Sequence, residues 1–247
     1  MALKLFCVPY AGGSASVYYS WGKYMPEKIV LIPIELAGRM RRLAEPFYDT
    51  LEAAADDVFQ HIKKALCPGD QYAIFGHSMG SWIAYETARI IWGKRDAAKP
   101  VCLFFSGNYA PHVSEGTGKL HLLPDIEFQY EVLRLGRTSE IIFNNEQLCQ
   151  LFSPIIRADY RILEEYRPSR SVNFVCNCPV SVLCGDMDNI THSQAAEWAR
   201  YVSGEFSVNF FSGGHFFIHD SQKDVVSHLA CFLTQHTNCL ASCFQHN

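Results

Sequence analysis

The stretch Tyr72-Ala-Ile-Phe-Gly-His-Ser-Met-Gly80 decides the fold. It runs from a short apolar segment, Tyr72–Phe75, through two flanking glycines into a segment whose pattern predicts a helix from about Met79 to Trp92. A strand-to-helix turn this sharp forces its central residue, Ser78, into a strained conformation, and the glycines let the neighbouring backbone pass close by. The sequence therefore predicts an elbow that holds the Ser78 hydroxyl above the edge of a sheet.

Outward from this elbow, short β-branched and aromatic runs alternate with segments of helical period. A helix is predicted over about 51–66 with Thr50 as N-cap, and another from Ser221, where Ser221-Gln-Lys-Asp224 resembles a capping box. The alternation predicts an α/β fold, an open, mostly parallel, doubly wound sheet with right-handed crossovers. The runs predicted as strands buried on both faces are Leu5–Val8, Ile29–Ile32, Tyr72–Phe75, Val101–Phe105, Val180–Leu183 and Phe206–Phe211.

Residues from about 112 to 172 interrupt this alternation. They hold only helical patterns, over Phe128–Leu135, Ser139–Phe143 and Gln147–Glu165. Because no internal repeat or Pro/Gly/Ser-rich linker divides the chain, we expect one domain over residues 1–247. Within it, residues 112–172 are predicted to form an inserted helical lid.

Composition excludes several classes of protein. The 247 residues are 49% hydrophobic and 19% charged, which is typical of a globular chain. A net charge of −4 lacks the basic excess that nucleic-acid binding requires. We find no secretory signal pattern and no apolar run of bilayer length, and the ten cysteines are scattered rather than arranged as a disulfide framework. We therefore expect a reduced, cytoplasmic protein that binds neither nucleic acid nor membrane.

The C-terminal tail carries histidines and cysteines at short intervals, His236, Cys239, Cys243 and His246. These residue types bind Zn²⁺, but their spacing is not that of a familiar zinc module. A fraying chain end is the better interpretation, so we expect no metal site.

A serine hydroxyl is a poor nucleophile until a base takes its proton and an acid orients that base. On this architecture the acid should follow Ser78 at the carboxyl end of a later strand. The segment Cys184-Gly-Asp-Met-Asp188 follows such a strand. Asp188 is the predicted acid, because three residues past Gly185 the loop can turn back towards the site. Asp186 is the alternative.

The base is expected after the last strand, where Ser212-Gly-Gly precedes His215. Two glycines would let this loop bend over the nucleophile, so His215 is the predicted base. His219 and His192 are the alternatives, and His77 is expected to support the elbow.

A tetrahedral intermediate also needs two backbone N–H donors. Met79, directly after the nucleophile, should supply one. The loop Pro9-Tyr-Ala-Gly-Gly-Ser14 should supply the other from Ala11, with Tyr10 as second choice. A dinucleotide-binding role for this loop is disfavoured, since a third glycine at the required spacing is missing.

Five segments together carry a family resemblance: Pro9-Tyr-Ala-Gly-Gly13, Glu35–Pro46, the elbow, Leu151–Glu164 and Gly213-Gly-His215. Over nearly the whole chain they resemble the type II (external, editing) thioesterases of nonribosomal peptide and polyketide assembly lines, within the α/β-hydrolase fold. The second and fourth segments are far more specific than the elbow. Departures from the family pattern are Ala37 in place of proline, and Arg137 and Ser139 where the lid usually has Gly-Gly-Thr-Pro.

The resemblance implies an enzyme that hydrolyses acyl groups from the phosphopantetheine thiol of acyl or peptidyl carrier proteins, for editing or product release. It implies Ser78, Asp188 and His215 as the triad and the 112–172 region as a mobile lid. The substrate carries the phosphopantetheine, so no cofactor is expected. Carrier binding would be transient, and we expect a monomer.

A cluster of arginines, Arg39, Arg41 and Arg42, could meet an acidic carrier surface or the phosphate of its arm. A solvated turn is the alternative, and Arg39 could instead pair internally with an acidic residue and hold its loop.

Apolar lid residues facing inward would form a tunnel for an acyl chain, although simple packing must account for most of them. These residues are Phe128, Leu133, Ile141, Ile142, Phe143, Leu148 and Phe152. Two other functions stay open: a small-molecule carboxylesterase or acyltransferase with the same triad, and a binding protein that sequesters acyl-carriers through a vestigial site.

Overall fold

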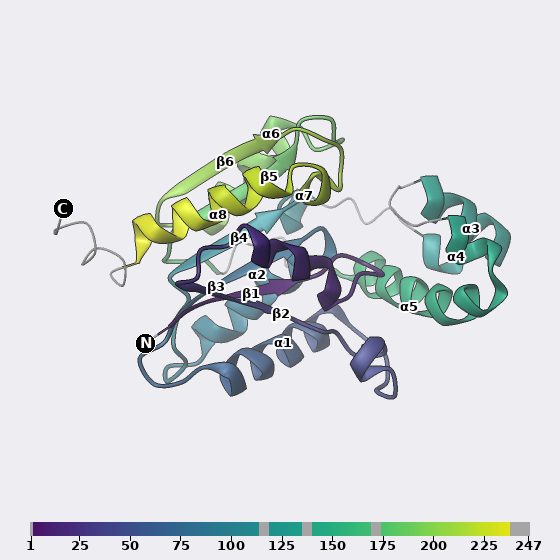
Figure 1. The fold of residues 1–247 in the computed structure, drawn as a ribbon, viewed down its shortest axis with the longest axis horizontal. Coiled ribbons are helices and arrows are strands. Elements are labelled where there is room, and N and C mark those ends of the chain that lie inside the picture. Colours follow the sequence, from purple (N-terminus) through teal and green to yellow (C-terminus); the bar gives the residue numbers. More distant parts are fainter. Residues whose placement is uncertain (1, 114–118, 135–139, 169–173, 238–247) are drawn as a thin grey trace.

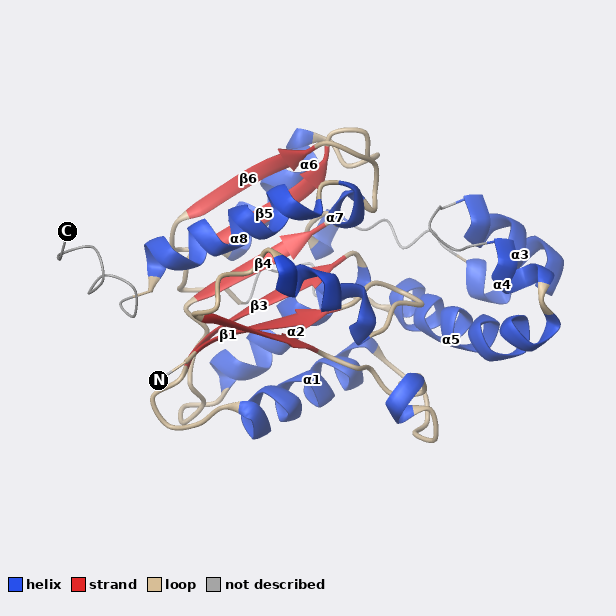
Figure 2. Ribbon diagram, in the orientation of Figure 1, coloured by secondary structure: helices blue, strands red, loops and turns tan. Residues whose placement is uncertain are grey.

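A computed structural model describes residues 2–113, 119–134, 140–168 and 174–237, and the structural statements below refer to these residues. Six strands form one sheet in the order β2-β1-β3-β4-β5-β6, and every neighbouring pair is parallel (Figures 1 and 2). The predicted α/β sheet is therefore confirmed. The strands are β1 Leu3–Val8, β2 Ile29–Pro33, β3 Gln71–His77, β4 Cys102–Ser106, β5 Val180–Gly185 and β6 Phe206–Phe211.

The inner strands are buried on both faces, as their continuous hydrophobicity predicts. All residues of β4 and β5 are buried, and β3 is buried after its first residue. The same prediction is wrong for β2 and β6, whose side chains are mostly half-buried. Both lie at an edge of the sheet, with a neighbouring strand on one side only.

Helices cover both faces of the sheet (Figure 2). Successive strand residues point to opposite faces, so Ile74 of β3 packs in one apolar core and Phe75 in the other. Side chains of α1 and α2 complete the first core, and those of η1 and α8 complete the second. These helices are α1 Leu51–Ala65, α2 Met79–Gly93, η1 Ala15–Lys23 and α8 Gln222–His236.

The predicted helix starts meet different outcomes. The Thr50 hydroxyl oxygen accepts the N–H of Ala53 at 3.1 Å, so this N-cap is confirmed. The capping box predicted at Ser221 is wrong. Ser221 precedes α8, but its side chain makes no capping bond and its hydroxyl donates to the carbonyl of Ser212 at 2.6 Å. Because the Ser221 hydroxyl is hydrogen-bonded to this loop carbonyl, it does not cap α8.

Between β4 and β5 the chain leaves the sheet for a group of helices at one end of the molecule (Figure 1). Their described parts contain no strand, as the sequence predicts. Phe128 is fully buried with Val132 and Ile156, and Phe143 and Phe152 pack against them. These aromatic residues fill a small core of the helical group itself. The elements are η3 Pro111–Val113, η4 Leu120–Leu122, α3 Asp125–Arg134, α4 Glu140–Asn144 and α5 Glu146–Glu165.

Short helical turns complete the described chain: η2 Met40–Arg42, α6 His192–Ala196, η5 Glu197–Tyr201 and α7 Phe217–Asp220. Among the described residues, no helix has the length and apolar character needed to span a bilayer. Arg137, Ser139, Cys239, Cys243 and His246, which the sequence singles out, lie outside the described residues.

Candidate active site

Ser78 stands at a strained turn between β3 and α2. Its φ of 54° and ψ of −118° lie where non-glycine residues are rare. A Cβ on Gly76 would lie 2.0 Å from the carbonyl oxygen of Gly80, and one on Gly80 would lie 2.3 Å from that of Val8. Both glycines are therefore required by backbone contact, which is the physical reason for the spacing in the elbow motif.

Three side chains from distant segments meet above this turn. The Nε2 atom of His215 lies 3.0 Å from Oγ of Ser78, and its Nδ1 atom lies 2.9 Å from Oδ2 of Asp188. If Nδ1 carries the proton and donates a hydrogen bond to the Asp188 carboxylate, Nε2 is unprotonated and accepts a hydrogen bond from the Ser78 hydroxyl. The three residues follow the carboxyl ends of β3, β5 and β6, the edge where the sequence predicts them.

The alternative residues have other neighbours. Asp186 accepts the N–H of Gly213 at 2.9 Å and so ties the two loops that carry the acid and the base. His219 lies with Nε2 3.1 Å from the hydroxyl of Tyr10. His192 stacks on Phe210 with ring centroids 3.8 Å apart. The structure thus brings Asp188 and His215 to Ser78.

His77 lies behind the elbow and is fully buried. Its Nδ1 atom is 2.9 Å from the hydroxyl oxygen of Ser106, and its ring contacts that of His215 at 5.4 Å between centroids. Burial, with smaller contributions from His215 and His219, lowers the pKa of His77 well below 6.5. A neutral ring therefore packs beside the base, which fits its predicted supporting role.

The two expected N–H donors come from the segment after the nucleophile and from the loop after β1. Met79 is the first residue of α2, where backbone N–H groups have no acceptor within the helix. Ala11 belongs to the loop after β1, and it lines the pocket that contains Ser78. Tyr10, the second choice, lines this pocket too.

The docking role predicted for Arg39 is wrong, because this side chain is buried. Its Nη1 and Nη2 atoms bind Oδ2 and Oδ1 of Asp159 at 2.7 Å each, and Nη1 also donates to the carbonyl of Gly13 at 2.9 Å. Burial alone would lower the pKa of Arg39, but the charge of Asp159 raises it. The internal pairing that the sequence left open is what the structure contains.

Arg42 is also engaged inside the protein, which corrects its predicted docking role. It donates to Oδ2 of Asp57 at 2.7 Å, to Glu45 at 2.8 Å and to the carbonyl of Glu35 at 2.9 Å. Arg41, by contrast, is exposed. The predicted cluster is therefore reduced to one surface arginine.

A pocket of ≈ 340 Å³ opens over the triad. Sequence reasoning did not identify four of its residues: Asn189 and Phe216, which adjoin the predicted acid and base, and Arg134 of α3 and Tyr160 of α5. Tyr160 falls in the Leu151–Glu164 segment that carries the family resemblance, but nothing in the sequence places its side chain, or that of Arg134, over the triad; the packing of the helical group over the sheet does so. The lining residues are Tyr10, Ala11, Ser78, Arg134, Tyr160, Asp188, Asn189, His215 and Phe216.

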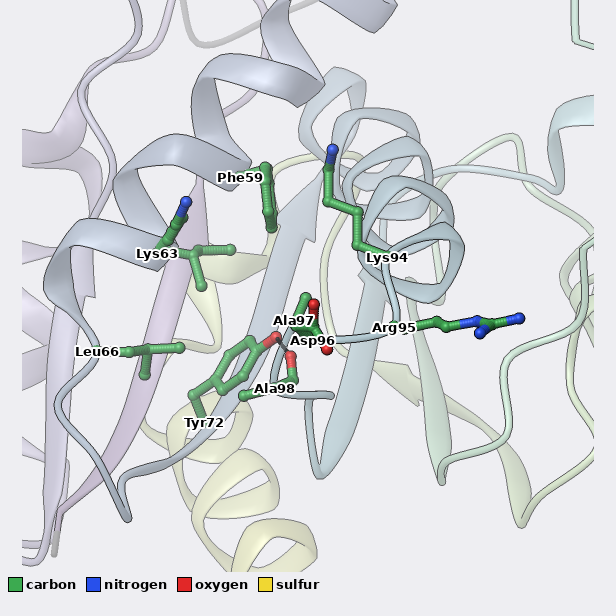
Figure 3. A pocket seen from close by; sticks show the side chains of 10 residues that line it. Phe59, Lys63, Leu66, Tyr72, Lys94, Arg95, Asp96, Ala97 and Ala98 are labelled. Carbon is green, nitrogen blue, oxygen red and sulfur yellow. Dashed lines mark hydrogen bonds between the residues drawn. The ribbon is translucent and has the colours of Figure 1, made fainter.

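A second hollow, of ≈ 480 Å³, lies near the opposite end of the sheet (Figure 3). Its floor includes Tyr72, near the start of β3, whereas Ser78 follows the end of that strand. The Tyr72 hydroxyl donates to the carbonyl of Ala98 at 2.6 Å. Lys63 and Lys94 stand at its walls, but the hollow is remote from the triad.

A parallel sheet with a serine elbow, and with an acid and a histidine on later strand ends, defines the α/β-hydrolase class. Within it, the chain belongs to the thioesterase family, because the family model described as "Thioesterase domain" matches residues 3–233.

Relatives agree with this assignment. Gramicidin S biosynthesis protein GrsT of Aneurinibacillus migulanus is 35% identical over 225 residues, 91% of this chain and 86% of that protein. The structure of ClbQ, from the colibactin NRPS/PKS pathway, matches with a TM-score of 0.88 at 33% identity, covering 95% of this chain and 98% of that one. BorB, a type II thioesterase from the borrelidin biosynthetic cluster, matches with a TM-score of 0.83 at 31% identity, covering 94% and 93%.

These matches confirm the resemblance seen in the sequence. The chain is a thioester hydrolase of the type II thioesterase family, built on the α/β-hydrolase fold.

Proposed function

We propose that the chain hydrolyses acyl thioesters on the phosphopantetheine arm of carrier proteins, with Ser78 as nucleophile, His215 as base and Asp188 as the acid that orients it. The observation that carries this proposal is the hydrogen-bonded chain of these side chains, with heavy-atom distances of 3.0 Å and 2.9 Å, on a strained elbow. Such distances are within the reach that proton transfer needs.

The reaction has two halves. Oγ of Ser78 bonds to the thioester carbonyl carbon while its proton passes to Nε2 of His215. The C–S bond then breaks and the sulfur leaves as a thiolate, which needs little help from an acid because an ordinary thiol has a pKa of about 8.5. The proton on His215 passes to this thiolate or to solvent, so the imidazole is neutral again before the second half. A water molecule, deprotonated by His215, attacks the acyl-serine, releases the carboxylic acid and restores the serine hydroxyl.

Both halves pass through an intermediate with a negatively charged oxygen. We assign its two donors to the N–H groups of Met79 and Ala11, since one opens a helix beside the nucleophile and the other lines the same pocket. The chemistry requires no cofactor beyond the phosphopantetheine that the substrate brings.

The partner in this proposal is an acyl or peptidyl carrier protein, bound transiently by a monomer in the cytoplasm. Two similar proteins support the choice of partner: ClbQ comes from the colibactin NRPS/PKS pathway, and BorB is a type II thioesterase from the borrelidin biosynthetic cluster. Exposed Arg41 would meet the acidic carrier surface. Arg134 lines the pocket over Ser78, so its positive charge would lie near the phosphopantetheine arm when that arm enters the pocket.

The test is mass spectrometry of the protein after brief exposure to an acylated phosphopantetheinyl carrier. We expect an acyl adduct on the peptide that contains Ser78. Ser78→Ala should lose the adduct and reduce kcat on the order of 10⁶-fold, as expected when the nucleophile of a triad is removed. The exposed Ser20, changed to alanine, is the matched control and should retain both the adduct and the turnover.

Unchanged product release by Ser78→Ala would overturn the proposed mechanism, whereas binding of the acylated carrier without turnover or adduct in the wild type would leave a binding protein. Parallel assays with an acylated carrier, an acyl-CoA and a short nitrophenyl ester test the substrate class. Preference for the nitrophenyl ester over the carrier would contradict a carrier-directed enzyme.

A further inference from the structure

Helix α5 of the inserted helical group lies directly on the loop after β1. The Oδ2 atom of Asp159 accepts the N–H of Gly12 at 2.7 Å, although 147 residues separate them. One turn earlier in α5, Ile156 lies so close to Gly12 that a Cβ there would be 2.8 Å from its side chain. Gly12 also has a φ of +76°, which favours glycine. The loop and the helix are thus fitted to each other.

The same carboxylate also holds the Gly13–Ser14 peptide of the loop, through Arg39. This side chain pairs with both oxygens of Asp159 and donates to the carbonyl of Gly13 at 2.9 Å. Both charged groups are almost completely buried, with 2% and 3% of their side chains exposed. A buried bidentate ion pair allows only a narrow range of geometry. It therefore fixes the positions of the Gly12 N–H and the Gly13 carbonyl, the two loop groups to which it is hydrogen-bonded.

The loop held in this way carries Ala11, the residue before Gly12. A donor to the developing oxyanion is effective only within about 2.7–3.1 Å of its final position, so small shifts of this backbone matter. Resting on the function proposed above, we infer that Asp159 is a positioning residue for the oxyanion hole. Helix α5 then belongs to the catalytic apparatus as well as to the roof of the pocket, to which it contributes Tyr160.

Asp159→Asn tests this inference, because it retains the shape of the side chain but removes its charge. An asparagine amide would also turn an NH₂ group towards the guanidinium or the loop N–H. For a short acyl thioester we expect kcat to fall by about 10- to 100-fold, below the 10²–10³ typical of losing a donor outright, with KM within about twofold of wild type.

A second readout separates positioning from mere structural support. A trifluoromethyl ketone analogue of the substrate forms an adduct with Ser78 that carries an oxyanion. Its inhibition constant should rise by the same factor by which kcat/KM falls, because both report the same hole. Binding of the carboxylic acid product, which forms no such adduct, should change little.

Two further variants complete the design. Arg161→Ala removes another tie of α5, the bond to the carbonyl of Tyr48 at 3.0 Å, and should retain kcat and inhibitor affinity. Arg39→Lys retains the charge but loses the bidentate geometry, and it should lie between Asp159→Asn and wild type. This variant decides the test if Asp159→Asn does not fold, as judged by circular dichroism and thermal unfolding.

Wild-type kcat and wild-type inhibitor affinity in folded Asp159→Asn, or in Arg39→Lys, would overturn the inference. A rise in KM alone would also overturn it, because α5 would then act only on substrate binding. If Ser78→Ala still turned over the thioester, the proposed function would fail instead, so the two failures are distinguishable.

Discussion

His77, a fully buried histidine beside the base, gives a prediction at the scale of one residue. Its pKa lies well below 6.5 in the folded protein. Just below pH 6.5 the ring is therefore still neutral in the folded state, while the same histidine in the unfolded state binds a proton. The stability that this neutral ring contributes is present above about pH 6.5 and is lost as the pH falls, by up to about 1.4 kcal/mol per pH unit. His228, whose pKa is also lowered by burial, adds an effect of the same sign.

We therefore expect the free energy of unfolding to fall between pH 7 and pH 5, and to fall less steeply in His77→Gln. Urea unfolding at several pH values measures both slopes. Equal slopes for wild type and variant would show that His77 does not remain neutral on folding.

Single residues also differ in how far the sequence could reveal their roles. Ser78 follows from a motif of five consecutive residues, because the strand, glycines and helix that create the elbow are local. Asp188 and Asp186 lie two residues apart after the same strand, and only the loop geometry distinguishes them. Arg39 has a charge typical of a surface residue, and its burial depends on Asp159, which lies 120 residues further along the chain.

At the scale of an element, the turn around η2 is held by one arginine. Arg42 binds Asp57, which is half-buried, and burial would raise the pKa of this carboxyl if hydrogen bonds from Arg42 and Tyr48 did not hold it below 3.8. Arg42→Ala should therefore reduce the free energy of unfolding by about 1–3 kcal/mol, the usual effect of leaving a charged partner unsatisfied. The neighbouring Arg41→Ala should change it by less than about 0.5 kcal/mol.

Denaturant unfolding of both variants measures this difference. A loss in Arg41→Ala equal to that in Arg42→Ala would mean that the turn depends on its total charge rather than on specific bonds.

Elements were the most predictable level of this protein. All six strands and the main helices lie where hydrophobic periodicity predicts them, since periodicity acts over a few residues. The capping box at Ser221 failed because the carbonyl of Ser212, from another segment, competes for the same hydroxyl. Burial of the edge strands was overestimated because a strand's own sequence does not specify its position in the sheet.

At the scale of the whole molecule, the proposed partner gives a prediction for Arg41. Arg41→Glu should lower kcat/KM for an acylated carrier several-fold at low salt, and the difference should shrink as salt screens the surface charges. Turnover of a short acyl thioester without a carrier should not change. Steady-state kinetics at several salt concentrations with both substrates measures this.

Arg95→Glu is the matched control, because Arg95 lines the hollow at the opposite end of the sheet (Figure 3). Equal losses from both reversals would indicate a general effect of net charge. No loss from Arg41→Glu would remove this residue from the docking surface.

By itself, the sequence determined the α/β sheet, the elbow at Ser78 and the strand ends where an acid and a base should stand. Periodicity, glycine spacing and chain order carry this information because they act locally or through a common topology. Only the tertiary structure decided which charged groups pair and which residues line the pocket. Those choices depend on contacts across long separations, such as the 120 residues between Arg39 and Asp159 and the 147 between Gly12 and Asp159. No local pattern records such a contact, because either partner alone would suit a solvated surface equally well.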